Sequence, residues 1–239
     1  MAKINKLQKS GVTIYPATIP QAVIDSETGK TQKEVNDDVV ALSKLVDDAS
    51  VKIENIVVNG DFRNGLTGWT AGPSVTVLNG IVSIDTASGA TLTHGLDIPA
   101  NNVCYLAVRS QNTNEQVTLR MALRKLDSTN VSNVYTMGRG QGWLNESLLL
   151  TTSSNAEQLS TYRAGVGGII QLDYIVLINL TETFGAGNEP TKEEFESLIL
   201  GTDYFEGEIT IPAQKIMQWQ LAMIRQNRNA IIALGGTII

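Results

Sequence analysis

Hydrophobic residues follow a helical repeat in the first quarter of the chain. Seven of them are spaced alternately four and three residues apart, with mostly polar residues between them: Val35, Val39, Leu42, Val46, Ala49, Ile53 and Ile56. A Ser/Thr-x-x-Glu capping box at residues 31–34 precedes the repeat and indicates a helix start. This heptad seam predicts a coiled-coil oligomerisation helix over residues 32–55, and its β-branched residues are compatible with a homotrimer. Packing of the same helix against its own domain is the alternative.

The pattern changes over residues 56–182, where short apolar runs are separated by Gly, Asn, Asp and Ser. Asn79-Gly80 lies between two β-branched runs and predicts a β-hairpin, because a type I′ turn needs positive φ at both central residues. Apolar and polar residues alternate from Val117 to Arg124, so one face of that strand should be buried. Strands at this spacing predict a mainly β fold, an antiparallel β-sandwich or jelly roll.

The two ends of the chain differ from this central block. Residues 1–31 contain β-branched residues and two prolines, and we expect an extended N-terminal arm because proline fits an edge strand or an irregular segment. Residues 183–239 should form a C-terminal helical segment. It opens with a second capping box, from Thr191 to Glu194, and contains a longer amphipathic stretch near its end.

Composition limits the partners that the chain can have. A net charge of −6 argues against nucleic acid, because binding to a polyanion needs a basic surface. One cysteine and one histidine are too few for a disulfide framework or a Cys/His metal site. We expect no membrane insertion, because no apolar run approaches the roughly 20 residues of a transmembrane helix. The first residues lack the apolar run of a signal peptide, so we expect synthesis in a cytoplasm.

No catalytic motif is visible, and we expect no enzymatic activity. Gly185 and Gly187 precede a helix start, as in phosphate-binding loops, but the third glycine or the lysine of such loops is missing. Neighbouring glutamates would repel an anion, so a plain connector is expected. His94 has no nucleophile motif beside it and is expected to be a surface or hairpin histidine. Cys104 precedes an apolar run and should be buried.

Two tryptophans are candidates for contact with a sugar, since aromatic rings offer large amphipathic contact surfaces. The turn-rich surroundings of Trp69 favour a structural role for that residue. Trp143 has three hydrogen-bonding neighbours in the sequence, and with them it forms the candidate glycan-binding site: Arg139, Gln141 and Asn145. Core packing of Trp143 is the alternative.

Two stretches carry a resemblance to a known family. The segment NIVVNGDFRNGLTGWT opens the central block, and QLDYIVLINL closes it. Together they resemble the carbohydrate-binding modules of the galactose-binding-like jelly-roll type. The resemblance implies that fold, and it implies a structural calcium near the ends of the block. Asp61 and Asp173 are then candidate oxygen ligands, although ordinary surface or capping roles would explain them too. No other cofactor is expected.

Two further stretches resemble parts of bacteriophage proteins. INLTETFGAGNEPTKEEFE is similar to a segment that follows such a jelly roll in phage tail, baseplate and fibre proteins, and residues 3–36 look like fibre-protein N-terminal arms. The resemblance implies a virion structural protein of head or tail, made in the host bacterial cytoplasm. Its arm would dock onto other virion proteins, and its jelly roll would attach to host-surface glycan. A connector or capsid decoration protein without glycan binding is the alternative, and the binding module of a glycan-degrading enzyme is a third, disfavoured one.

Overall fold

The computed structural model divides the chain into two compact units. The larger unit comprises residues 51–211, and the smaller one combines residues 1–50 with residues 212–239. The structure describes the following residues: 7–9, 12–14, 23–25, 37, 50–85, 91–112, 119–136, 141–163, 168–199 and 202–233. Most of the larger unit is therefore described, and the candidate site lies within it.

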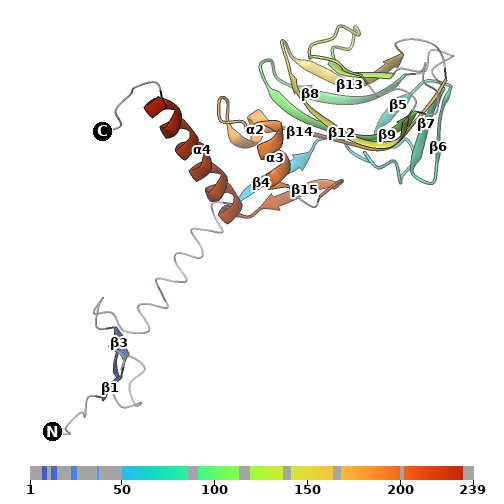
Figure 1. Cartoon of the computed structure of the whole chain (residues 1–239). Coiled ribbons are helices and arrows are strands. Elements are labelled where there is room, and N and C mark those ends of the chain that lie inside the picture. Colours follow the sequence, from blue (N-terminus) through green and yellow to red (C-terminus); the bar gives the residue numbers. More distant parts are fainter. Residues whose placement is uncertain are drawn as a thin grey trace. The chain divides into compact units, whose positions relative to one another are not determined.

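Two five-stranded antiparallel sheets form the body of the larger unit (Figure 1). The first has the order β11-β10-β13-β8-β5, and its strands are Tyr135–Thr136, Leu119–Arg124, Ala156–Arg163, Leu92–Ile98 and Trp69–Ala71. The second has the order β12-β9-β14-β7-β6, and its strands are Gln141–Thr151, Val103–Asn112, Ile169–Asn179, Ile81–Asp85 and Val75–Leu78. From β7 onward the chain changes sheet at almost every step. This arrangement is a jelly roll, and the predicted antiparallel β-sandwich is confirmed.

The hydrophobic core lies between the two sheets. Along β9, Leu106 and Val108 are buried in the core, whereas Ala107 and Arg109 are partly exposed on the other face. This two-residue alternation follows from the pleat, which points successive side chains to opposite faces of a strand. A surface site on this unit must therefore be built from the alternate, outward-facing residues.

The predicted hairpin is confirmed at β6 and β7. These strands pair in antiparallel register from Val75 opposite Ile84 to Leu78 opposite Ile81. Asn79 and Gly80 form the two-residue turn with φ of 51° and 77°. Positive φ at both positions is what a type I′ turn requires, and asparagine and glycine are the residues that adopt it most easily.

The sandwich unit begins earlier than the hydrophobic pattern predicts. Residues Val51–Asn55 form strand β4, which pairs antiparallel with β15, Gly207–Ile211. Ile53 is fully buried in this strand, and Ile56 packs against the sandwich core. Neither residue belongs to a helical seam, so their assignment to the heptad repeat was wrong.

The physical reason for this error is the distant partner of β4. A short β-branched segment becomes a strand when a neighbouring edge satisfies its backbone hydrogen bonds, and that edge comes from residues 207–211. The unit consequently runs over residues 51–211 rather than 56–182. The remaining seam positions lie outside the described residues: Val35, Val39, Leu42, Val46 and Ala49. Asp37, the described residue within that stretch, is helical and exposed.

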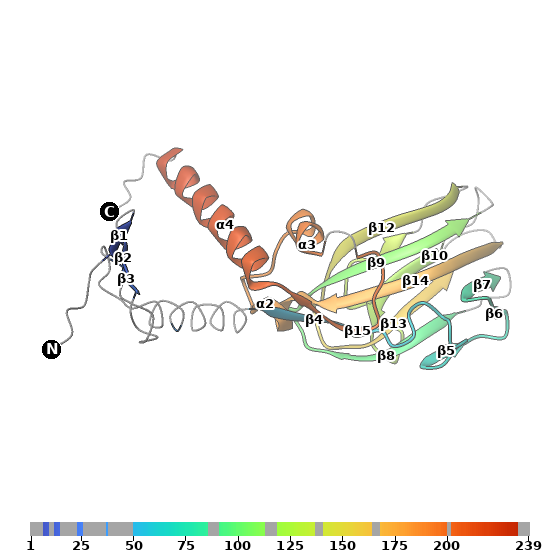
Figure 2. The ribbon, with the colours of Figure 1, turned by 90° about the horizontal axis from the view of Figure 1, so that it is seen from below.

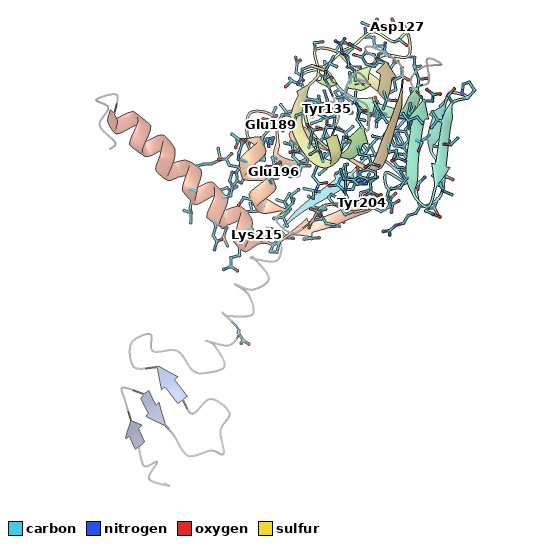
Figure 3. All side chains as sticks on the ribbon, turned by 45° about the vertical axis from the view of Figure 1, so that its right-hand side comes forward. Asp127, Tyr135, Glu189, Glu196, Tyr204 and Lys215 are labelled. Atoms are coloured by element: carbon cyan, nitrogen blue, oxygen red, sulfur yellow. The ribbon has the colours of Figure 1, made fainter. Side chains whose placement is uncertain are left out.

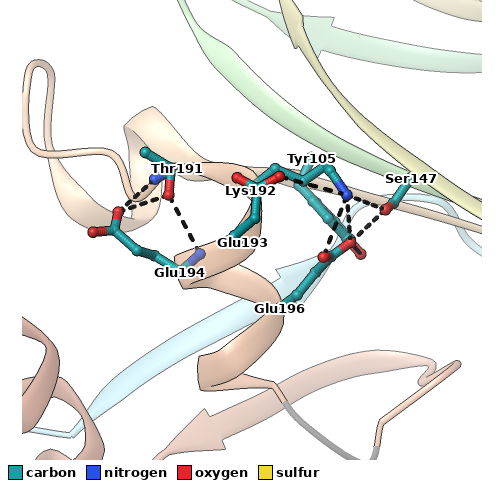
Figure 4. A network of polar contacts seen from close by, with 7 residues as sticks. All are labelled: Tyr105, Ser147, Thr191, Lys192, Glu193, Glu194 and Glu196. Atoms are coloured by element: carbon teal, nitrogen blue, oxygen red, sulfur yellow. Dashed lines mark hydrogen bonds and ion pairs between the residues drawn. The ribbon is translucent and has the colours of Figure 1, made fainter.

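Two short helices follow the last sandwich strand: α2, Leu180–Phe184, and α3, Lys192–Leu198. The predicted capping box of α3 is confirmed. The Glu194 carboxylate accepts the Thr191 backbone N–H at 2.8 Å, and the Thr191 hydroxyl accepts the Glu194 backbone N–H at 3.3 Å (Figure 4). These two bonds satisfy N–H groups that a helix start leaves without intrahelical partners.

The glycine loop between α2 and α3 is a connector, as predicted. Gly185 and Gly187 adopt φ of 87° and 80°, a region in which side chains are strained. The Glu189 carboxylate accepts the Gly187 backbone N–H at 2.8 Å and the Thr181 hydroxyl at 2.6 Å. The Glu189 carboxylate therefore already accepts the Gly187 N–H, which a bound phosphate would need as a donor.

The smaller unit contains a sheet and a helix. Strands β1, β2 and β3, Leu7–Lys9, Val12–Ile14 and Val23–Asp25, form an antiparallel sheet in the predicted extended arm. Helix α4, Ala213–Ala233, follows β15 in the sequence (Figure 2). Among the described residues, no helix combines the length and the apolar character needed to cross a membrane.

Candidate functional site

The Asn-Gly-Asp-Phe motif at residues 59–62 has a structural role. Asn59 is 3% exposed, and its carbonyl oxygen accepts the indole N–H of Trp69 at 3.2 Å. The Trp69 ring packs against Phe62 and His94, with ring centroids 5.2 and 5.0 Å apart. Trp69 is thus a core residue, as its turn-rich surroundings predict, and it offers no face to a sugar.

His94 is buried, and the expectation of a surface or hairpin histidine was wrong. It lies in β8, and its Nε2 accepts the backbone N–H of Val58 at 3.1 Å. Burial lowers the pKa of His94, which favours the neutral imidazole that this acceptor role requires. The sequence could not show this, because the ring packs against Trp69 from another part of the chain.

Cys104 is buried, as expected. Its burial raises the pKa of the thiol to about 12, so the reactive thiolate is not formed near neutral pH.

The strongest candidate for ligand contact is Trp143 in β12. Its side chain is half-buried, and it belongs neither to the hydrophobic core nor to the residues packed against that core. The Arg109 guanidinium lies over the Trp143 ring, 5.3 Å from the centroid. Asn145 is exposed and pairs with Arg109 in the β12–β9 register. The core-packing alternative for Trp143 is therefore disfavoured.

The two other predicted glycan contacts are only partly described. Gln141 pairs with Asn112 through the backbone, at the start of β12, but its side chain lies outside the described residues. Arg139 lies outside them altogether. Of the four predicted residues, the structure places Trp143 and Asn145 on one surface.

Several further polar residues belong to this surface. Arg109 donates to Asp173 of β14 at 2.6 Å, and Gln111 donates to Gln171. Gln171 in turn donates to the Ser83 hydroxyl of β7 at 3.2 Å. We call this surface the Trp143 face and define it by six residues: Arg109, Gln111, Trp143, Asn145, Gln171 and Asp173.

The alternation in β9 was the signal that could have found Arg109 and Gln111. The sequence of β9 places Tyr105, Ala107, Arg109 and Gln111 on one face of the strand. The other face is apolar from Cys104 to Val108 and polar after that. The pairing of β9 with β12 and β14 was not visible in the sequence. For that reason the contacts of Arg109 with Trp143 and Asp173 could not be foreseen.

The Trp143 face combines the groups that a carbohydrate needs. An aromatic ring provides an apolar contact surface, while amides, a guanidinium and a carboxylate can donate to or accept from hydroxyl groups. Arg109 covers one side of the Trp143 ring, and part of the Trp143 surface stays exposed to a ligand. The ion pair with Asp173 also fixes the guanidinium, which reduces the entropy lost when a ligand binds.

The predicted calcium ligands do not fit a calcium site. The Asp61 carboxylate pairs with Arg63 at 3.1 Å, and the Asp173 carboxylate pairs with Arg109 at 2.6 Å. Calcium needs six to eight oxygen ligands, and a neighbouring cation disfavours it. Among the described residues, no three His, Cys, Asp or Glu side chains gather into a possible metal site.

A second aromatic residue lies on the outer face of the other sheet. The Arg124 guanidinium lies 4.6 Å from the centroid of the Tyr162 ring, and the Tyr162 hydroxyl accepts from the Asn130 amide at 3.0 Å. The alternation of β10 predicted that Arg124 faces outward, but Tyr162 was missed because its strand is separated from β10 by more than 30 residues. Arg124, Asn130 and Tyr162 thus form an aromatic cluster on the opposite sheet, against which the effect of changes in the Trp143 face can be compared.

Comparisons with known proteins give likenesses to solved structures. No family model matches the chain, and no curated protein does. Among solved structures, a family 16 carbohydrate-binding module is similar, with 17% identity and a TM-score of 0.41 over 52% of this chain and 100% of that one. The enzymatically active domain of tailspike protein 4 from bacteriophage CBA120 is similar too, with 16% identity and a TM-score of 0.39 over 52% of this chain and 21% of that one.

An arabinose-bound α-L-arabinofuranosidase gives a third likeness. It has 13% identity and a TM-score of 0.40, over 54% of this chain and 27% of that one. The similar region thus spans about a quarter or less of the tailspike and arabinofuranosidase chains, whereas it spans the whole of the family 16 module.

Proposed function

We propose that this chain is a structural protein of a bacteriophage virion, in a head fibre, tail fibre or other tail-associated part, that presents its jelly roll to glycan on the host surface. The Trp143 face is the observation that supports glycan binding. It places a half-buried tryptophan among fixed polar groups on one open sheet surface. The virion assignment is supported by the phage-like sequences at residues 3–36 and 178–196.

Binding at this face would be weak for one site. A sugar would lie against the exposed part of Trp143 and exchange hydrogen bonds with Asn145 and the Gln111–Gln171 pair. An open surface leaves much of a ligand in water, so a single copy gives little affinity. Several linked copies act at high effective concentration, and an oligomer would bind a repetitive host surface far more tightly. The protein binds glycan and does not cleave it in this proposal.

Replacing Trp143 by alanine tests the glycan proposal. The substitution removes the ring while leaving the core unchanged, because Trp143 is not part of it. We expect adsorption of the protein to host cells to fall at least about 10-fold, as for other central aromatic contacts. A cell-adsorption assay or a glycan array measures the effect.

Tyr162→Ala is the matched control, because it removes an aromatic side chain from the outer face of the opposite sheet. It should leave adsorption unchanged. Equal adsorption by wild type and Trp143→Ala would contradict the proposed site and support a connector without glycan binding. A loss limited to Tyr162→Ala would place the binding site on the other sheet.

The oligomer is tested at the heptad seam. Val39→Asp combined with Val46→Asp places charges at two predicted seam positions, and we expect monomers where the unchanged chain forms trimers. Analytical ultracentrifugation distinguishes the two states. A trimer that persists in the double variant would show that the subunits associate through another surface.

A further inference from the structure

Helix α4 carries a row of apolar side chains on an exposed side. Met217, Leu221 and Ile224 are 41%, 53% and 63% exposed, and they are spaced four and three residues apart. Residues at this spacing lie one above another on the same side of a helix. Single exposed apolar residues are ordinary, but a row of three along one helix indicates a docking surface. We call this row the α4 stripe.

The ladder formed by β4 and β15 shows which segment of the chain starts beside this helix. The two strands pair antiparallel, and Val51 at the start of β4 lies opposite Ile211 at the end of β15. The chain therefore enters the larger unit and leaves it at the same end of this ladder. Helix α4 begins directly after the exit. Residues 32–49 of the predicted coiled-coil helix come before the entry, and apart from Asp37 they lie outside the described residues.

The two segments match in length and in expected register. Helix α4 has 21 residues and the segment 32–49 has 18, so two helices of about 31 and 27 Å would run from the same end of the ladder. Both rise equally per residue, so antiparallel helices would continue the register of the ladder. Met217 and Leu45 are each six residues from it, and Leu221 and Ala41 are each ten residues from it. The apolar residues of the two segments therefore fall opposite each other.

Farther from the ladder, the same register brings opposite charges together. Four residues of the segment share the spacing of the α4 stripe and would lie on one side of a helix: Leu45, Ala41, Asp38 and Glu34. Arg228 continues the spacing of the stripe, four residues after Ile224, and its position falls opposite Glu34. Arg225 falls opposite Asp37 in the same way. The Ile224 position meets Asp38, between the apolar pairs and the charged ones.

Net charge favours this segment over a second copy of α4. Helix α4 contains one lysine, two arginines and no acidic residue, a net charge of +3. Residues 32–49 contain five carboxylates and two lysines, a net charge of −3. Opposite charges attract and like charges repel across an interface, so two copies of α4 would disfavour each other.

The predicted trimer seam lies on a different side of the segment. At 3.6 residues per turn, Val39, Leu42 and Val46 are centred about a quarter turn from the line through Leu45 and Ala41. A helix over these residues can therefore use its seam for self-association and its adjacent side for α4. Docking of α4 and formation of a trimer are compatible.

We propose that α4 docks antiparallel on residues 32–49 of the same chain and forms a helical hairpin with them. Burial of the α4 stripe against Leu45 and Ala41 drives the docking, and the charged positions farther from the ladder fix its register. Each subunit then contributes two helices to the stem of the proposed fibre instead of one. The inference goes beyond the glycan function and does not depend on it.

Cysteine pairs test the docking in the full chain. Leu221→Cys with Ala41→Cys places two thiols at facing positions, and mild oxidation should join them within one chain. Leu221→Cys with Ser43→Cys is the control pair, because Ser43 is two residues from Ala41 but on the other side of the helix. A disulfide needs Cα atoms within about 7 Å, so we expect the facing pair to react at least about 10-fold faster. Native Cys104 is buried and does not compete.

Charge reversal tests the register. Arg228→Glu should slow the cross-link about 2- to 5-fold, as expected for an exposed ion pair, and adding Glu34→Arg should restore the rate. Lys215→Glu is the matched control and should leave the rate unchanged. Lys215 lies in the first turn of α4 (Figure 3), two residues before Met217, and is therefore on the side away from the α4 stripe. Non-reducing gels and peptide mass spectrometry measure the cross-link.

Each other outcome would overturn the hairpin. Equal rates for the facing and control pairs would show that α4 does not dock on this side of the segment. Cross-links between chains would assign the α4 stripe to residues 32–49 of another subunit. Disulfide-linked dimers of Leu221→Cys alone, in dilute protein, would assign it to a second copy of α4. Sedimentation of the Val39→Asp/Val46→Asp variant is a separate measurement, so the hairpin and the trimer can fail independently.

Discussion

Gly60→Ala is expected to destabilise the jelly roll severely. A Cβ atom at residue 60 would lie closer than 3.0 Å to the backbone carbonyl oxygen of Ile175, a distance that real Cβ atoms essentially never show. The two backbones are held together there, because the Ile175 N–H donates to the Gly60 carbonyl at 2.9 Å. The obstacle is backbone in β14 rather than a flexible side chain, so it cannot move aside without disrupting the sheet.

The loss can be measured by urea unfolding. Overpacking typically costs about 1–3 kcal/mol, and a clash with backbone belongs at or above the upper end of that range. A domain has about 5–15 kcal/mol of stability in total, so the variant should lose a large fraction of it and unfold at a clearly lower urea concentration.

Gly95→Ala is the control for this experiment. Residue 95 lies in β8, where an added Cβ would meet nothing within 4 Å, and the substitution should change the free energy of unfolding by less than about 1 kcal/mol. Equal stability of Gly60→Ala and Gly95→Ala would show that the 58–62 segment does not approach β14 as closely as described.

Local sequence signals predicted the local features of this fold. The Asn79-Gly80 turn and the Thr191–Glu194 capping box depend on residues within four positions of one another, so their physics is contained in a short stretch. The alternation of β10 likewise placed Met121 and Leu123 in the core and Arg120 on the outer face, because the strand pleat fixes these directions, although Ala122 on the outer face is buried too. The turn and the strand alternation are also the features that led to the mainly β prediction.

Contacts between distant segments were not predictable in the same way. Ile53 was assigned to a helix because its spacing fits a heptad, and its partner in the neighbouring strand, Ile209, lies 156 residues further along the chain. Asp173 was assigned to calcium on a resemblance, but β14 lies beside β9 and gives it Arg109 as a partner.

Asn59→Ala is expected to destabilise the unit by about 3–4 kcal/mol, because it removes three hydrogen bonds of a buried side chain and strains the backbone. The Asn59 amide donates to the carbonyls of Gly65 and Thr67 at 3.0 and 3.1 Å, and its oxygen accepts the Asn64 N–H at 3.0 Å. These bonds close the loop that delivers Trp69 to the core. The φ of Asn59 is 52°, a left-handed conformation that asparagine tolerates better than alanine.

Asn59→Gly separates the two contributions. Glycine also lacks the amide, but it adopts φ of 52° without strain, so this variant should lose the hydrogen bonds alone. Unfolding in urea, monitored by the fluorescence of the buried Trp69, should rank the wild type above the glycine variant and the glycine variant above the alanine variant by about 1 kcal/mol. If both variants were as stable as the wild type, the Asn59 side chain would not hold this loop. In that case the Asn-Gly-Asp-Phe motif would owe its role to Gly60 and Phe62 instead.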